Sequence, residues 1–444
     1  MKLISGLDLA KSIQLFFVAL ALTLNATGIY ADTNFENEVT KILEPLINKR
    51  KIPGYYLAVF KGGVKVLEKS EGYADDKTKL VPQAKTLYAL DSMIRPLTAS
   101  ALMVLVENGE LNLKDPITKF LPSFGKMKVA ASGSLTAPLV MAEREITLLD
   151  LLTHTSGLTN GTEKGSNQTK SNDVSKLYEK NGVFTQDSEV GDLSLHIKEL
   201  SRLPLIAQPG EKFNLSIGYD VISRVIEIVS GQNFESFLAQ RVLLPLEMTD
   251  THFVVPPQKM HRLARMYSPA FWGFNVPGTP KMYQNSGLTS SDYKNVGIKT
   301  PTRISGGTGL ISTPEDYSKF LNFLLQRENK NSLAFSQSTF DLMLTDQLKI
   351  SLSEPSEQIS NKPGYSFSLG MAIKNESNSK SVSSSKKMQI DYLYGQSNYD
   401  TQFWIDPANE VFGLFMVQIF PANYPLVAQL ENLADRFLSV SPEN

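Results

Sequence analysis

The spacing of apolar residues changes from helical to strand-like in the first part of the chain. Helical spacing comes first, at Val39, Ile42, Leu43, Leu46 and Ile47. Apolar stretches at 55–60 and 64–69 then flank Lys61-Gly62-Gly63, which is typical of a β-hairpin. We therefore expect an N-terminal helix, with Pro45 inside it, followed by two paired strands.

From about residue 92 to residue 330 the apolar pattern is mainly helical. Thr313-Pro314-Glu315-Asp316 is typical of a helix start, since threonine caps helices and proline suits the first position. Polar loops are predicted at 160–172 and at the serine-rich segment 375–387, and a last helix at 426–438. The predicted late strands are Phe367–Lys374, Met388–Gly395, Thr401–Ile405 and Val411–Gln418.

Strand patterns at both ends of the chain, with helices between them, indicate one sheet built from distant parts of the sequence. The predicted fold class is α/β (α+β), in which residues 55–69 pair in the same sheet as residues 388–418. The predicted sheet subdomain covers about 36–91 and 330–440, and a helical subdomain at about 92–330 is inserted into it.

The first residues form a separate segment. Lys2 and Lys11 precede an apolar stretch from Ile13 to Leu24, and small residues follow up to Ala31. This order is typical of a secretory signal peptide, and the apolar stretch is shorter than the about 20 residues that span a membrane. We therefore predict that residues 1–31 are removed, and that the mature protein is periplasmic or secreted without membrane insertion.

The composition narrows the classes of function. With 42% hydrophobic residues, 20% charged residues and a net charge of -1, the chain has no basic excess that would favour nucleic acid. The count of zero cysteines excludes disulfides and a cysteine-linked lipid anchor. The histidines are scattered, so neither a metal nor a cofactor is expected.

The candidate chemistry lies in Ser92-Met93-Ile94-Arg95-Pro96. A serine hydroxyl becomes a useful nucleophile only beside a base, and a lysine three residues further on is one source of that base. Here that position holds Arg95, whose guanidinium stays protonated (pKa above about 12) in proteins. Arg95 therefore cannot take the proton of Ser92. Ser92 is expected at a helix N-terminus, with Asp91 available as a cap.

The stretch from Tyr88 to Pro116 resembles the serine β-lactamase-related family, in particular its carboxylesterase branch, where the corresponding line reads Ser-Met-Thr-Lys-Pro. The resemblance covers about residues 36–440 and implies a β-lactamase/transpeptidase-like fold, with an antiparallel sheet flanked by helices and an inserted mainly helical subdomain. Further segments that follow in the family's order are Pro53-Gly54, Leu151–Leu158, Pro209–Phe213, Pro245–Phe253, Gly306–Asp316 and Phe403–Pro407.

The resemblance also implies three catalytic elements: Ser-x-x-Lys, a tyrosine-containing triplet, and a short strand that faces the serine. Ser92 is then the nucleophile, Arg95 stands at the lysine position, and Leu215 stands at the tyrosine position. In the third element, Gln396 and Asn398 stand where an aromatic or basic residue and a glycine are expected. A side chain at Asn398 would crowd an approaching substrate.

Other residues could supply the missing groups. Tyr219 lies one helical turn beyond Leu215, although a tyrosine at that spacing is more typical of packing. His154 suggests a Ser/His pair, but a local structural role at a helix–loop junction is favoured, since its segment is a scaffold element in the family. Arg95, Asn398 and Tyr399 are the predicted ligand-binding residues, and Arg95 could instead pair with Asp91.

Two functions follow from these residues. The first is a secreted serine hydrolase that cleaves an ester or amide through Ser92, with activity weak or lost because both bases are replaced. The second is a pseudoenzyme that binds an acyl, peptide or anionic ligand, or a protein partner. The sequence does not identify the small-molecule ligand or the oligomeric state.

Overall fold

The computed structural model describes residues 33–49, 51–130, 133–160, 173–182, 192–269, 282–283, 304–326, 333–348, 365–374, 392–420 and 426–438. The predicted signal peptide (1–31), the predicted polar loop at 161–172 and the serine-rich segment at 375–387 lie outside these residues. Within them, no helix is long and apolar enough to cross a membrane.

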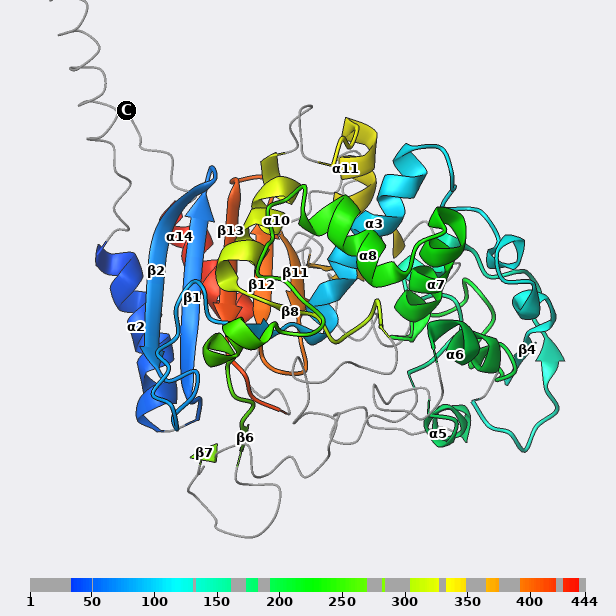
Figure 1. Cartoon of the computed structure of the whole chain (residues 1–444), viewed down its shortest axis with the longest axis horizontal. Coiled ribbons are helices and arrows are strands. Elements are labelled where there is room, and N and C mark those ends of the chain that lie inside the picture. Colours follow the sequence, from blue (N-terminus) through cyan, green and yellow to red (C-terminus); the bar gives the residue numbers. More distant parts are fainter. Residues whose placement is uncertain are drawn as a thin grey trace, which may run out of the picture.

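One seven-stranded antiparallel sheet lies to one side of the helical part of the molecule (Figure 1). Its strand order is β2-β1-β13-β12-β11-β10-β9, so the first two strands join a sheet whose other members come from the end of the chain. The register pairs Tyr56 of β1 with Met416 of β13. The prediction of one sheet built from both ends is therefore confirmed. The strands are β1 Gly54–Lys61, β2 Val64–Gly72, β9 Tyr365–Phe367, β10 Ala372–Lys374, β11 Tyr392–Gln396, β12 Gln402–Asp406 and β13 Val411–Met416.

The two faces of the sheet bury alternate residues of β1 in different cores. Tyr55, Leu57 and Val59 of β1 pack with helices α2 (Thr33–Asn48) and α14 (Val427–Leu438). Their neighbours Tyr56 and Ala58 belong to a larger core on the other face. This alternation follows from the period of two along a strand. The predicted N-terminal helix, hairpin and last helix are confirmed, with Pro45 inside α2.

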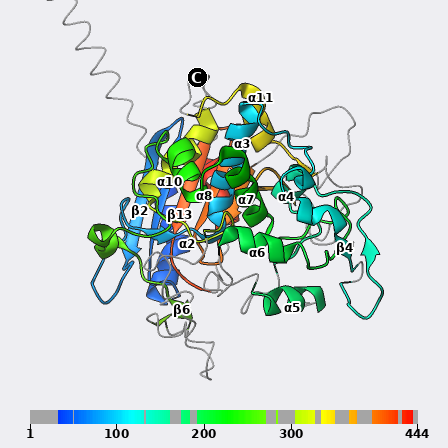
Figure 2. The same cartoon turned by 45° about the vertical axis from the view of Figure 1, so that its right-hand side comes forward.

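The larger core is filled by helix α3 (Arg95–Glu107), which lies beside α7 (Gly218–Ser230) and α8 (Phe234–Leu238) (Figures 1 and 2). Every residue from Pro96 to Leu105 is buried, as expected for a helix that is apolar on all sides. A short 3₁₀ turn, η1 (Asp91–Ile94), leads directly into it. The other described helices are α4 Leu148–Leu152, α5 Asp173–Lys180, α6 Leu193–Leu200, α7 Gly218–Ser230, α8 Phe234–Leu238, α10 Pro314–Gln326 and α11 Gln337–Leu344.

Short pieces of strand lie outside the main sheet. They are β3 Tyr88–Ala89 with β8 Ile311–Ser312, β4 Lys128–Val129 with β5 Val140–Met141, and β6 Ser268–Pro269 with β7 Met282–Tyr283. The pairing of β3 with β8 holds the segment before Ser92 against the segment before α10. The predicted cap of α10 is present, since the Asp316 N–H donates to the Thr313 hydroxyl at 3.1 Å.

The prediction of a single strand over Phe367–Lys374 is wrong. The chain turns back within it, and β9 and β10 pair as a hairpin. Gly370 has φ +91°, which favours glycine, and the Ser368 N–H donates to the Met371 carbonyl at 2.8 Å. A Cβ on Gly370 would lie 3.0 Å from the Arg95 carbonyl oxygen. The turn therefore packs against the start of α3, which the sequence pattern did not indicate.

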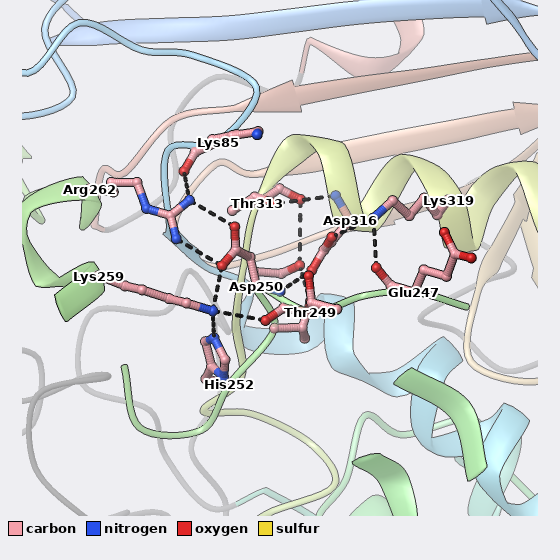
Figure 3. A network of polar contacts seen from close by, with 12 residues as sticks. Lys85, Glu247, Thr249, Asp250, His252, Lys259, Arg262, Thr313, Asp316 and Lys319 are labelled. Carbon is pink, nitrogen blue, oxygen red and sulfur yellow. Dashed lines mark hydrogen bonds and ion pairs between the residues drawn. The ribbon is translucent and has the colours of Figure 1, made fainter. Parts of the chain in front are cut away.

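A polar network fastens the turn at 249–252 to α10 (Figure 3). The Asp250 carboxylate accepts two hydrogen bonds of 2.8 Å from Arg262 and pairs with Lys259 Nζ at 2.6 Å. The Arg262 guanidinium, foremost, holds the pKa of Asp250 well below its ordinary value against the opposing effect of burial. The Asp250 N–H and the Thr251 hydroxyl donate to Asp316 at 2.7 and 3.0 Å. The charged groups of Asp250, Lys259, Arg262 and Asp316 each have a protein partner, so we assign this network a structural role.

Candidate functional site

Ser92 lies at the entrance of the buried helix. It is half-buried in the 3₁₀ turn η1, and the Arg95 N–H donates to the Ser92 carbonyl. Side chains three residues apart eclipse one another in a 3₁₀ turn, so Arg95 and Ser92 lie on the same side. The expected start of a helix at Ser92, with Arg95 one turn further on, is present.

Asp91 does not cap this helix, which corrects the sequence-based expectation. Its backbone has φ +45°, and its side chain turns to other parts of the chain. One carboxylate oxygen, Oδ1, accepts a hydrogen bond from the Thr308 hydroxyl at 2.9 Å. The other, Oδ2, accepts from the backbone N–H of Asn398 at 2.9 Å and from the Ser92 hydroxyl at 3.3 Å. Asp91 therefore joins the serine turn to two distant loops.

Arg95 carries a charge that no described residue neutralises. Its guanidinium carbon lies 5.9 Å from the centre of the Tyr219 ring. Its Nε is buried without a hydrogen-bond partner in the part of the chain that the structure describes, and no ion pair of Arg95 within 4.0 Å is found there. The alternative pairing with Asp91 is not observed, because that carboxylate bonds Thr308 and Asn398 instead.

His154 is a fully buried neutral imidazole beside this arginine. Burial first, and the Arg95 charge second, hold the pKa of His154 well below its ordinary value. The ring lies 5.3 Å from the rings of Tyr219 and Phe367, centre to centre. Its Nδ1 accepts the backbone N–H of Ser216 at 3.2 Å. His154 thus holds the loop that carries Leu215, which is the structural role favoured by the sequence.

The hydroxyl of Tyr219 does not serve as a replacement for the missing tyrosine. It donates to the Leu152 carbonyl at 2.9 Å, and burial raises the pKa of the phenol. Leu215, at the tyrosine position, is half-buried in the loop before α7 and has no titratable group. The Asn214 side chain fixes that loop by donating to the Leu158 and Leu215 carbonyls at 2.8 and 3.2 Å.

The third element lies at the end of β11. Gln396 is half-buried and pairs in register with Gln402 of β12. Asn398, which stands where the family has a glycine, follows in the turn. Its backbone N–H donates to the Asp91 carboxylate. Tyr399 is 6% exposed, and its ring packs against Phe420 in an apolar cluster. The contact of Tyr399 with a ligand stays a prediction, and in this conformation its ring serves packing.

The structure thus brings together Ser92, Arg95 and the Asn398 backbone, and it adds two residues that the sequence did not assign to the site, Asp91 as a bridge and Thr308 as its partner. An acid directly before the serine was the only signal for Asp91. No set of three or more His, Asp or Glu side chains within the described ranges is arranged to hold a metal ion.

An antiparallel sheet backed by two terminal helices, with a serine at the start of a buried central helix that faces a turn of the sheet, defines a serine hydrolase fold of the β-lactamase and penicillin-binding class. The comparison with known families agrees, because residues 39–436 match the Beta-lactamase family. The chain belongs to this family.

The chain is similar to an esterase and to a protein whose name states no activity. Protein Rv1367c of Mycobacterium tuberculosis (strain ATCC 25618 / H37Rv) is 32% identical over 290 residues, which are 64% of this chain and 65% of that protein. Esterase EstB of Burkholderia gladioli is 29% identical over 235 residues, 53% of this chain and 56% of the esterase. The chain thus spans less than two thirds of the length of these relatives.

Solved structures show the same fold at lower identity. EstCE1, a hydrolase with promiscuous acyltransferase activity, superimposes with a TM-score of 0.69 at 20% identity, covering 90% of this chain and 98% of its own. The octameric penicillin-binding protein homologue from Pyrococcus abyssi gives a TM-score of 0.63 at 20% identity, covering 92% and 78%. The predicted β-lactamase/transpeptidase-like architecture is confirmed.

Proposed function

We propose that this protein binds an acyl or peptide ligand with an anionic group at the site around Ser92, and that its hydrolytic activity is weak or lost. The observation that carries this proposal is the environment of the serine hydroxyl. Its hydrogen bond goes to Asp91 Oδ2 at 3.3 Å, while the lysine and tyrosine positions hold Arg95 and Leu215. A carboxylate is a much weaker base than a lysine amine or a tyrosine phenolate, so a serine hydroxyl that has only a carboxylate beside it is a poor nucleophile at neutral pH.

The other groups that could act as a base have structural partners. His154 Nδ1 accepts the Ser216 N–H, and the Tyr219 hydroxyl donates to the Leu152 carbonyl. Loss of a general base lowers the rate by about 10²–10⁴-fold. The enzymatic alternative, ester or amide hydrolysis through Ser92, is supported by the resemblance to EstB, an esterase.

Arg95 supports an anionic ligand. A guanidinium offers five donors in a planar fork that suits carboxylate and phosphate groups. Here it lies over the Tyr219 ring with a buried Nε that has no partner among the described residues. A carboxylate or phosphate-like group bound to the guanidinium would neutralise this charge. From the sequence we also propose that residues 1–31 direct the protein to the periplasm or the medium.

Hydrolysis of a short-chain nitrophenyl ester or a chromogenic cephalosporin is expected to stay near the background rate. The physical reason is that the lysine and tyrosine positions hold Arg95 and Leu215, and the Ser92 hydroxyl donates only to the Asp91 carboxylate among the described residues. A carboxylate is a much weaker base than an amine or a phenolate. Initial rates of the purified protein and of Ser92→Ala provide the measurement and its control. Turnover at about 1–10³ s⁻¹ that is abolished in Ser92→Ala would contradict the proposal and establish an enzyme.

Arg95→Ala is expected to remove ligand-induced stabilisation. A ligand at 100 times its dissociation constant stabilises a fold by about 2.7 kcal/mol, which raises the melting temperature measurably. Acyl-peptide carboxylates and inorganic phosphate are the probes. Arg241→Ala is the matched control, because Arg241 also lies over a ring, at 5.8 Å from the centre of Phe237. A shift that persists in Arg95→Ala would show that the anion binds elsewhere.

A further inference from the structure

Two donors from separate parts of the chain converge on one oxygen next to Ser92. The oxygen is Asp91 Oδ2, which accepts the Asn398 backbone N–H at 2.9 Å and the Ser92 hydroxyl at 3.3 Å. The serine hydroxyl and the N–H at the end of β11 therefore point to the same place. The chain itself supplies the acceptor that fills it.

A backbone N–H aimed at a point beside a nucleophile is the arrangement that stabilises an oxyanion during acyl transfer. An oxygen that gains negative charge there would have to displace Asp91 Oδ2 from the Asn398 N–H. It would also develop its charge beside a carboxylate, and two like charges in a partly buried site repel one another. Asp91 thus opposes both the occupation of this point by an anion and the reaction of Ser92.

The carboxylate is held in this position from both sides. Its second oxygen accepts the Thr308 hydroxyl at 2.9 Å, and the residue is only 8% exposed. The backbone of Asp91 adopts φ +45°, a region in which Asp, Asn and Gly are the tolerated residues. Because the side chain is buried and bonded at both oxygens, the carboxylate is a fixed part of the site.

We propose that Asp91 is a specificity-determining residue that fills the acceptor position between Ser92 and Asn398. This inference rests on the proposed function and adds the chemistry of the ligand. A ligand's anionic group binds at Arg95, while the part of the ligand that reaches Ser92 is neutral or brings hydrogen-bond donors to the free lone pairs of Asp91. An anionic or developing oxyanionic oxygen is excluded from the point that Asp91 Oδ2 occupies.

The test is the rate at which a fluorophosphonate labels Ser92. In this reaction the Ser92 oxygen bonds to phosphorus, fluoride leaves, the hydroxyl proton passes to water, and the phosphoryl oxygen becomes more negative in the transition state. Asp91→Asn removes the charge and keeps a side chain that tolerates the backbone conformation. Because one oxyanion donor contributes about 10²–10³-fold, we expect Asp91→Asn to label at least ~10-fold faster than the unchanged protein. Intact-mass spectrometry measures the adduct.

Asp75→Asn is the matched control, since Asp75 is also 8% exposed and its substitution changes the net charge equally. It is expected to label like the unchanged protein. Asp91→Gly provides a second variant whose backbone suits a positive φ, and it is used where melting curves show that Asp91→Asn has not folded. A folded Asp91 variant that labels no faster than Asp75→Asn would overturn the inference.

The outcome is separable from that of the proposed function. The gain in labelling by Asp91→Asn is expected also in the Arg95→Ala background, because it depends on the point beside Ser92 and not on the guanidinium. If the ligands do not raise the melting temperature but Asp91→Asn still labels faster, the anion site at Arg95 is refuted and the role of Asp91 stands. If the gain is absent in both backgrounds, the role of Asp91 is refuted whatever Arg95 binds.

Discussion

A chain that carries Arg95→Lys together with Leu215→Tyr is expected to hydrolyse nitrophenyl esters about 10²–10⁴-fold faster than the unchanged protein. The lysine would stand one 3₁₀ turn from Ser92, on the same side. Its amine would lie near the buried Tyr219 ring and a neutral His154, where desolvation favours the uncharged, basic form. Arginine cannot reach that form in any protein environment.

The gain should exceed the product of the two single gains, because residues that act as a unit in catalysis are not additive. Gln396, Asn398 and the Asp91 carboxylate remain in place and set the upper limit of the rescue. Initial ester-hydrolysis rates of the two single variants, the double variant and the double variant with Ser92→Ala give the comparison. If the double variant is folded and hydrolyses esters no faster than the unchanged protein, the absence of the lysine and the tyrosine does not explain the low activity.

His154→Asn is expected to make the stability of the protein less dependent on pH. The pKa of the buried His154 lies well below its ordinary value of 6.5, so the native state keeps the imidazole neutral while the unfolded chain takes up a proton. Stability is therefore fully present above the unfolded pKa and is lost as the pH falls below about 6.5, by about 1.4 kcal/mol for each pH unit. Asparagine carries no such proton.

Asparagine is the suitable replacement because His154 has φ +58° and its Nδ1 accepts the Ser216 N–H, which an amide oxygen can also accept. At pH 8 the imidazole is neutral in both the native and the unfolded protein. The free energy of unfolding in urea at this pH therefore measures only the packing that is lost with the ring. The same measurement at pH 5 should show a smaller difference between the two proteins, or a reversed one. If the free energies of unfolding of the two proteins changed in parallel from pH 8 to pH 5, the native imidazole would take up a proton as the unfolded one does.

The parts of the fold that the sequence predicts well are those set by neighbours along the chain. The hairpin around Gly62-Gly63, with φ +54° and +78°, and the threonine cap of α10 depend on a few consecutive residues. The turn at Gly370 could not be predicted in the same way, since its close neighbour is the backbone of Arg95, which is far away in the sequence and would lie 3.0 Å from a Cβ at this position.

The same distinction applies to the site. Ser92, Arg95 and Leu215 could be proposed from the sequence because each occupies a position in a local motif. The role of Asp91 could not be predicted, since its partners Thr308 and Asn398 are 217 and 307 residues away. A carboxylate before a serine is equally compatible with a helix cap, and only the folded chain shows that its hydrogen bonds go to two loops instead.

The composite sheet also constrains the order in which the protein can fold during synthesis. β1 lies between β2 and β13. During synthesis it can pair with β2 early, but its second partner, β13, is absent until Val411–Met416 have been made. Until then its apolar side chains and one row of backbone hydrogen-bonding groups are unprotected, a state that invites pairing with other chains. We therefore expect the growing chain to bind chaperones until β13 has been synthesised.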